Sequence, residues 1–152
     1  MAELVALIGK NIILSTALSA WFCAQVIKTL TSYWKHGALN FERLIGAGGM
    51  PSSHTALVMS LAWAVGLQDG FTSSLFAVTL VLASIVMYDA TGVRRAAGKQ
   101  AKVINKLVRQ LRAEHTVRDI RLKELLGHTP LEVLAGAILG ISIAYGFKNL
   151  MG

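Results

Sequence analysis

This sequence contains few charged residues for its length. Charged residues make up 15% of the 152 residues and apolar residues 54%, whereas soluble domains usually contain about 25% charged residues. Four stretches carry no charged residue when histidine is neutral, namely 11–27, 44–68, 70–88 and 133–147. With their polar ends these stretches approach the roughly 17–25 residues that cross a bilayer. The composition therefore excludes an ordinary soluble domain and predicts an all-α membrane bundle of about four transmembrane helices.

Cysteine and recognisable metal or nucleotide motifs are also scarce. Cys23 is the single cysteine, so no disulfide can form within the chain and the redox compartment cannot be read from it. No cluster of cysteine, histidine or carboxylate residues has metal-ligand spacing, and no P-loop is present. We therefore expect no metal and no cofactor. The length predicts a single membrane-embedded domain over residues 1–152.

The apolar stretches predict the order of the spans and their orientation. A tight turn at 68–70 makes the second and third spans an antiparallel hairpin. Twelve of the fifteen Lys and Arg residues lie in the segments 35–51 and 89–129, which four spans place on one side. The positive-inside rule puts that side in the cytoplasm and both termini outside. The expected spans are Asn11–Trp34, Ser52–Leu67, Phe71–Tyr88 and Pro130–Phe147.

The segment 89–128 is long and basic, and its apolar residues recur at helical spacing. This pattern predicts a basic amphipathic helix on the cytoplasmic side, lying along an anionic membrane face or packing on the bundle. Membrane orientation explains the net charge of +7 better than nucleic-acid binding does. The apolar positions are Ala97, Ala101, Ile104, Leu107, Val108 and Leu111, and the basic ones between them are Lys99, Lys102, Lys106, Arg109 and Arg112.

A glycine-rich loop at 46–50 runs into the second predicted span. Pro51 suits the first helical position, and the amides of Ser52, Ser53 and His54 are expected to point out of a helix N-terminus. Such an end carries partial positive charge and binds anions. We expect this loop to hold a phosphate group. The alternative is an ordinary loop and N-cap.

A second motif, at residues 127–132, echoes the first with a glycine, a histidine and a proline. Thr129 and Glu132 have the spacing of a capping box, and Glu132 is also placed to serve His128. The topology gathers further ionisable residues at the same membrane face, where such groups are functional candidates. A phosphoryl-transfer site needs cations for the phosphoryl oxygens, a nucleophile and a proton donor. The gathered residues are Lys28, Arg43, Asp89, Arg94, Arg95 and Lys99.

These motifs resemble a known family. The run P-S-S-H at 51–54 is similar to the P-S-G-H motif of type 2 phosphatidic acid phosphatases, which are related to acid phosphatases and vanadium-dependent haloperoxidases. The run at 128–136 is similar to that family's last motif, H-x-x-x-D, with Glu132 in place of aspartate. Together with G-G-M-P-S-S-H and Y-D-A-T-G-V-R-R, it resembles the divergent branch of the family. Lys28 is the best match to the lysine of the family's first motif, K-x-x-x-x-x-x-R-P, and Arg43 is the candidate for its arginine. Arg94 or Arg95 is expected to replace the arginine that precedes the family's last histidine.

The resemblance implies a membrane lipid phosphatase that cleaves a lipid phosphomonoester or pyrophosphate. The positive-inside rule places its site at the cytoplasmic face, and we expect the membrane to be a bacterial plasma membrane. It implies that His128 is the nucleophile, assisted by Glu132, and that His54 is the proton donor. The expected phosphate ligands are Lys28, Arg43, Ser52, Ser53 and Arg94 or Arg95, supported by Asp89, Gly49 and Lys99. The alternative is a non-catalytic membrane protein that binds phosphorylated lipid or scaffolds a partner. Transport is a weaker alternative, because no span interior carries a charge pair.

Small residues recur every four positions in the fourth predicted span, at Gly136, Gly140 and Ala144. Such a stripe permits two helices to approach closely. We expect it to pack within the chain, and a contact with a second copy would instead make a homodimer.

Overall fold

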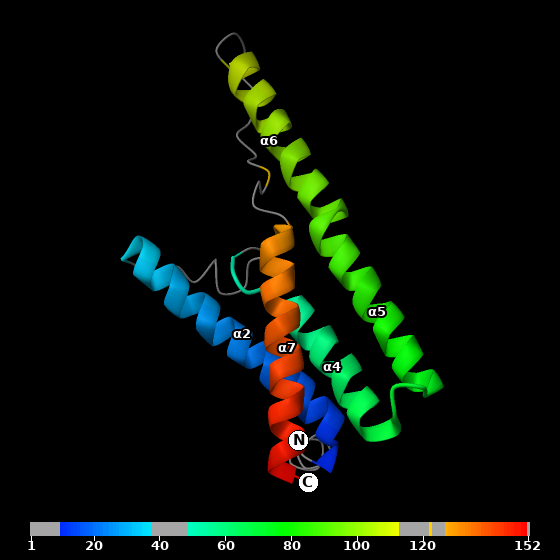
Figure 1. The fold of residues 1–152 in the computed structure, drawn as a ribbon. Helices are drawn as coiled ribbons and strands as arrows, with labels where there is room; N and C mark the ends of the chain where they lie inside the picture. The colour runs from blue at the N-terminus through cyan, green and yellow to red at the C-terminus, as the bar shows by residue number, and fades with distance from the viewer. Residues whose placement is uncertain (1–9, 38–48, 113–121, 123–126, 152) are drawn as a thin grey trace.

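The computed structural model describes residues 10–37, 49–112, 122 and 127–151, and these residues form helices and short connections without any strand. The predicted all-α fold is confirmed (Figure 1). The helices are α2 (Ile12–His36), α4 (Ser53–Asp69), α5 (Ser74–Thr91), α6 (Val93–Arg112) and α7 (Pro130–Met151).

Four of these helices form the membrane bundle. The helices α2, α5 and α7 are long and apolar enough to cross a bilayer. Helix α4 has 17 residues and no charged residue before its last one, Asp69; this length is at the lower end of the roughly 17–25 residues that span. The predicted bundle of about four transmembrane helices is thus confirmed, with α6 as an additional basic amphipathic helix.

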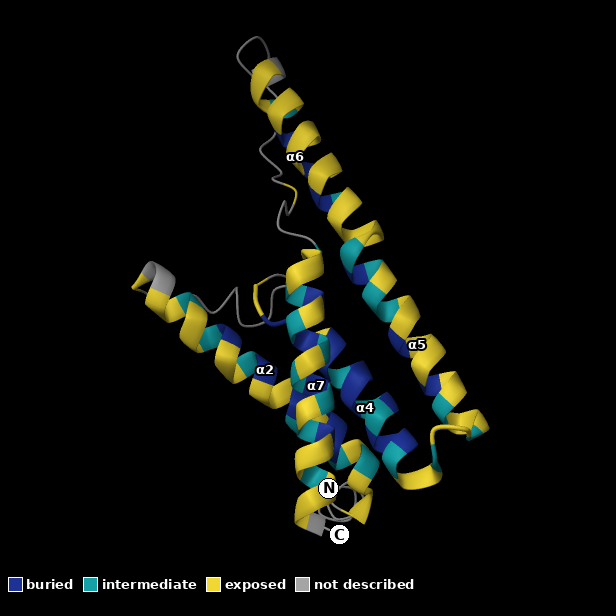
Figure 2. Cartoon of the chain, viewed as in Figure 1, coloured by how far each residue is buried: buried dark blue, intermediate teal, exposed yellow. Residues whose placement is uncertain are grey.

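Helix α4 is the centre of the bundle, because it packs against α2, α5 and α7 (Figure 1). Helix α4 has more buried residues than any other described helix, whereas α5 is largely exposed (Figure 2). Most of the exposed side chains of α5 are apolar, among them Val78, Val81 and Ile85. Lipid tails are as apolar as these side chains, so this exposure is typical of a helix at the edge of a membrane bundle.

Glycines let α7 lie almost directly on α4. A Cβ atom on Gly140 would lie 2.5 Å from the carbonyl oxygen of Ala56, and one on Gly136 would collide with the carbonyl oxygen of Ser52. Ala144 is buried on the same stripe. The stripe therefore packs within the chain, as expected, and it brings the N-terminus of α4 beside the first turns of α7.

Several helix boundaries differ from the sequence prediction because capping side chains decide where a helix begins. The hydroxyl of Ser73 accepts from the amide of Phe76 at 3.2 Å, so the third span begins at Ser74 instead of Phe71. Phe71 lies in the turn, with its ring centroid 5.6 Å from that of Trp63. Ser52 is the N-cap of α4, so Pro51 precedes the helix and does not occupy its first position.

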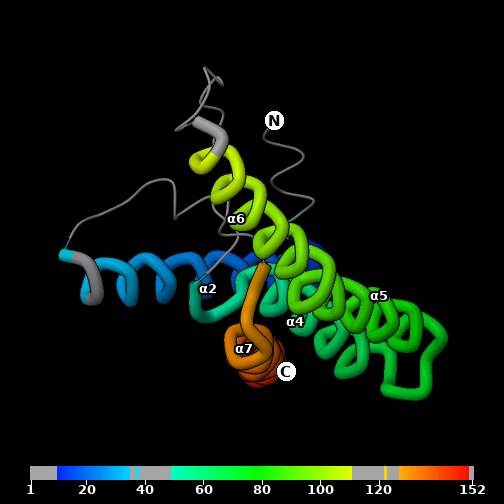
Figure 3. Tube along the Cα trace, turned by 90° about the horizontal axis from the view of Figure 1, so that it is seen from above, coloured from blue at the N-terminus to red at the C-terminus, as the bar shows by residue number. Residues whose placement is uncertain are grey.

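Helix α6 continues beyond the bundle in nearly the direction of α5 (Figures 1 and 3). Gly92 is the one residue between the two helices. The buried side chain of Asn105 donates to the carbonyl of Leu122 at 2.8 Å and accepts from its amide at 3.0 Å. One side of α6 thus contacts Leu122. Among the described helices α6 contacts only α5, so the predicted packing along the bundle does not occur, and lying along a membrane face stays a prediction.

Candidate active site

The N-terminus of α4 is fixed to α7 through Ser52. The hydroxyl of this buried residue accepts from the amide of Thr55 at 3.3 Å and from its hydroxyl at 3.0 Å. The amide of Ser52 donates to the carbonyl of Glu132 at 3.0 Å. The sequence predicted that this amide would point freely out of the helix. The structure shows instead that it is engaged in a hydrogen bond. The amides of Ser53 and His54 make no hydrogen bond within the described part of the chain, so they are the donors left at this helix end.

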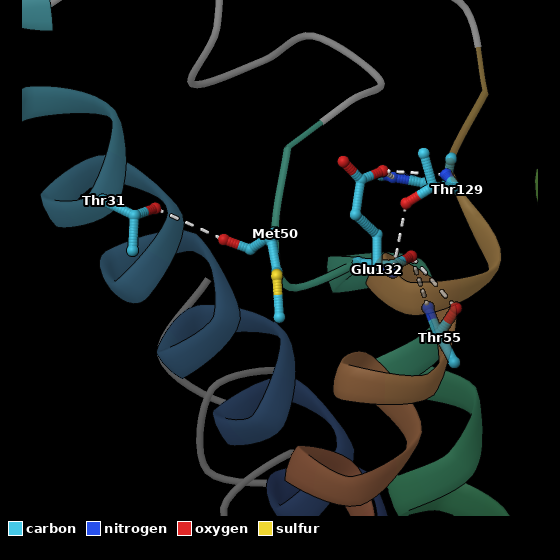
Figure 4. Close-up of polar contacts among 7 residues, drawn as sticks. Thr31, Met50, Thr55, Thr129 and Glu132 are labelled. Carbon is cyan, nitrogen blue, oxygen red and sulfur yellow. Dashed lines mark hydrogen bonds and ion pairs between the residues drawn. The ribbon is translucent and has the colours of Figure 1, made fainter. Parts of the chain in front are cut away.

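Glu132 closes the predicted capping box at the start of α7 (Figure 4). Its amide donates to the hydroxyl of Thr129 at 3.3 Å, and its Oε2 accepts from the amide of Thr129 at 3.0 Å. The same Oε2 lies 3.2 Å from Nδ1 of His128. Glu132 therefore both caps the helix and contacts the histidine, so the two sequence interpretations of this residue do not exclude each other.

His128 is held rigidly just before α7. Its side chain is 3% exposed, and its amide donates to the carbonyl of Ala90 at 2.8 Å. Gly127 adopts φ +89°, and a Cβ atom on it would lie 2.7 Å from the Cα atom of Arg95. Only glycine fits so close to this backbone. The contacts of Gly127 and Ala90 could not be predicted from the sequence, in which the only signal is the glycine directly before His128.

The contact with Glu132 sets the tautomer of His128. An ionised carboxylate can only accept, so Nδ1 carries the hydrogen and Nε2 keeps its lone pair. Burial lowers the pKa of His128 below its ordinary value of 6.5, and the hydrogen bond and charge of Glu132 oppose this shift only in part. Nε2 is buried and has no hydrogen-bond partner within the described residues. Because buried polar atoms are normally paired, this atom is the best candidate to meet a ligand.

His54 and Lys28 face the same region. The ring centroids of His54 and His128 lie 6.4 Å apart, with the ring planes inclined by 56°. Lys28 is buried and interacts electrostatically with Glu132 and with both histidines. Gly49 makes room for it, because a Cβ atom there would lie 3.2 Å from Cε of Lys28. The structure therefore brings together five residues that the sequence predicted for the site, namely His54, His128, Glu132, Lys28 and Gly49.

The basic residues after α5 are placed differently from one another. The charge of Arg94 acts on both histidines, and its Nε lies 2.6 Å from Oδ2 of Asp89. Arg95 is exposed and contributes backbone to the contact with Gly127. Lys99 is exposed on α6 and makes no hydrogen bond or ion pair with the site residues that the structure describes. Arg43 lies outside the described residues.

The loop before α4 is held to α2 by a hydrogen bond that could not be predicted from the sequence. The hydroxyl of Thr31 on α2 donates to the carbonyl of Met50 at 3.3 Å (Figure 4). The loop thereby lies between α2, which carries Lys28, and α7, which carries Glu132. Within the described ranges no group of three histidine, cysteine, aspartate or glutamate side chains is arranged to hold a metal ion.

The fold and this arrangement define an all-helical integral membrane protein with two histidines and several cations gathered where its helices begin and end. The family model described as "Divergent PAP2 family" matches residues 9–143, and the chain belongs to this family. It is 44% identical over 142 residues to an uncharacterized membrane protein, YuiD, of Bacillus subtilis (strain 168), an alignment that covers 86% of this chain and 90% of that protein. No solved structure matches the chain significantly.

Proposed function

We propose that the protein is a lipid phosphatase that hydrolyses a phosphomonoester or pyrophosphate of a membrane lipid through a phosphohistidine on His128, without a metal ion. The observation that carries the proposal is the state of His128. Its Nδ1 contacts Glu132 and its Nε2 is buried without a partner among the described residues. A neutral imidazole whose free nitrogen is oriented by a carboxylate is an activated nucleophile.

The two histidines then divide the chemistry between them. Nε2 of His128 attacks phosphorus, the bond from phosphorus to the lipid oxygen breaks, and His54 gives its proton to that oxygen. Water next attacks the phosphohistidine while His54 takes a proton from it, and the phosphorus–nitrogen bond breaks to release phosphate. His54 suits proton transfer because it is exposed, where the leaving group and water both have access.

Cations and amides would neutralise the phosphoryl oxygens. Lys28 and Arg94 supply charge from two sides, and the amides of Ser53 and His54 supply a helix N-terminus. Asp89 and Arg94 are 39% and 47% exposed, and such exposed ion pairs contribute at most about 1 kcal/mol. A phosphate dianion can therefore take Arg94 from Asp89. We keep Arg43 as an additional ligand and Ser52 as the residue that positions this helix end.

The proposal is tested with purified protein in detergent and a panel of short-chain lipid phosphates and pyrophosphates, with EDTA present. We expect phosphate release and inhibition by vanadate, which mimics the pentacoordinate phosphoryl group. Vanadate binding without phosphate release from any lipid, by protein that remains folded, would contradict the proposal. That result would favour the alternative, a non-catalytic protein that binds phosphorylated lipid.

We further propose that the site faces the cytoplasm of a bacterial plasma membrane, because the basic residues concentrate at that end. Single cysteines are introduced by Lys102→Cys, on α6, and by Thr72→Cys, at the opposite turn, each with Cys23→Ser. An impermeant thiol reagent added to intact cells should label only the second variant. Labelling of the first variant alone would reverse the orientation. A homodimer stays a prediction, and the stripe of Gly136 and Gly140 is already occupied by α4.

A further inference from the structure

Helix α6 has two contrasting faces outside the bundle. Its apolar side chains remain open to the surroundings, with Val93 61%, Val103 59%, Ile104 45% and Leu107 52% exposed. The opposite face carries Arg95, Lys99, Lys102, Lys106 and Arg109, and α6 contains no acidic residue. An exposed apolar stripe of this kind marks a surface that something covers.

Within the described residues, packing covers only the side of α6 next to the stripe. Ala101 and Asn105 are buried, and Asn105 bonds to Leu122. Ile104 and Leu107 stay exposed although they lie within two residues of the buried Asn105. The apolar stripe therefore needs a second partner.

The length of the α5–α6 unit places α6 outside the hydrocarbon core of the membrane. The range Ser74–Gln110 contains 37 residues. At the helical rise of 1.5 Å per residue it extends about 55 Å, whereas the hydrocarbon core is about 30 Å thick. Because α5 already crosses the core, the charged α6 starts where the headgroups begin. An anionic lipid surface is thus the nearest partner.

We propose that α6 docks on the anionic surface of the bilayer, with Ile104 and Leu107 inserted at the level of the headgroups and acyl chains. A helix with one apolar face and a strongly basic opposite face binds anionic lipid in this way. Charge favours lipid over a second copy, because two copies of α6 would bring two basic helices together. In the structure α6 continues nearly along α5 (Figure 1), so lying flat requires α6 to change direction at Gly92, the single residue that separates the two helices.

This docking is a binding function separate from phosphate hydrolysis, although it bears on the same site. Arg94 is in the first turn of α6, and Gly127 packs on the backbone of Arg94 and Arg95. The docked helix would therefore hold Arg94 and the segment before His128 at the depth of a lipid headgroup.

The test uses the full chain with Cys23→Ser in bilayer nanodiscs of phosphatidylcholine, with or without phosphatidylglycerol. One variant carries a fluorophore at Ile104→Cys and its matched control carries it at Lys102→Cys, half a turn away on the basic face. A quencher attached to the lipid acyl chain reports insertion. We expect several-fold stronger quenching at position 104 than at position 102, in discs that contain phosphatidylglycerol.

A second variant examines the charge. Adding Lys106→Gln and Arg109→Gln to the labelled Ile104→Cys protein should lower the ratio of docked to undocked helix by about fivefold for each basic residue removed, and salt should weaken docking of the parent protein. Gel filtration and circular dichroism confirm that each variant keeps its helices. Equal quenching at both positions, or none at either, would overturn the proposal. So would an efficient disulfide between two Ile104→Cys chains, since it would identify a second copy as the partner. No readout depends on turnover, so this proposal and the phosphatase proposal can fail separately.

Discussion

The two histidine motifs look alike in the sequence but differ in the structure. At the start of α4, His54 follows the N-cap Ser52 and is exposed. At the start of α7, His128 precedes the capping box, is 3% exposed and contacts Glu132. Both places are helix N-termini, which carry partial positive charge, but among the described residues only His128 has a carboxylate hydrogen-bonded to its ring. The proposed roles of His128 as nucleophile and His54 as proton donor rest on this difference.

Removing His128 should have the largest effect. The variant His128→Ala should lose at least about 10⁴-fold in kcat, because no nucleophile remains. Rapid quenching of labelled substrate without acid should trap an alkali-stable, acid-labile phosphohistidine in the parent protein and none in this variant. A phosphoenzyme that survives His128→Ala and disappears with His54→Ala would reverse the two roles.

Glu132→Gln separates the catalytic role of Glu132 from its capping role. Glutamine still closes a capping box, but its amide can donate to Nδ1 and move the hydrogen of His128 to Nε2. We expect about a 100-fold loss of kcat with little change in stability. The matched control Thr129→Ala removes the cap and should lower the free energy of unfolding by about 1 kcal/mol while activity is kept. Equal activity loss in both variants would show that Glu132 acts only through the helix.

His54→Ala should affect substrates according to their leaving group. A general acid contributes about 10²–10⁴-fold when the leaving oxygen is strongly basic, so hydrolysis of a lipid alkyl phosphate should slow by that amount. An activated aryl phosphate needs no proton on its leaving group, and its labelling of His128 should persist in part. Comparing burst amplitudes for the two substrates checks this. An equal loss for both substrates would assign His54 to phosphate binding instead.

Arg94→Gln and Arg95→Gln should give the smallest and most selective effect. Losing one charged contact to phosphate costs about 1.5–3 kcal/mol, or roughly 10–100-fold in affinity. We expect that loss in the vanadate inhibition constant of Arg94→Gln and almost none for Arg95→Gln. The two variants remove the same charge one residue apart, so net charge cannot explain a difference between them. A larger effect of Arg95→Gln would exchange the two assignments.

Much of the fold could be predicted from residue order. The charge-free stretches predicted the four membrane helices, and the spacing of apolar residues predicted α6. The pattern T-x-x-E predicted the capping box of Thr129 and Glu132, since these contacts span only three residues. The helix starts at Ser53 and Ser74 were missed by one to three residues, because serine side chains and not the apolar pattern end the preceding turn.

Part of the candidate site could not be predicted because it depends on contacts between distant segments. The bond from the amide of Ser52 to the carbonyl of Glu132 joins positions eighty residues apart. Of the two adjacent arginines in the described α6, only Arg94 acts electrostatically on both histidines, and no pattern in the sequence distinguishes the two. The close packing of Gly127 on the backbone of Arg95 likewise depends on the tertiary structure.

The sequence by itself determined that this protein is a membrane bundle, which residues can carry charge at its basic end, and which histidine has a carboxylate four residues away. These are properties of composition and of helical periodicity, which act over a few turns of one helix. The tertiary structure alone decided that His128 is buried and His54 is exposed. It also decided that the centroids of the two rings lie 6.4 Å apart. That arrangement arises because Gly136 and Gly140 let α7 lie against the backbone of α4, and close packing between helices cannot be read from either helix alone.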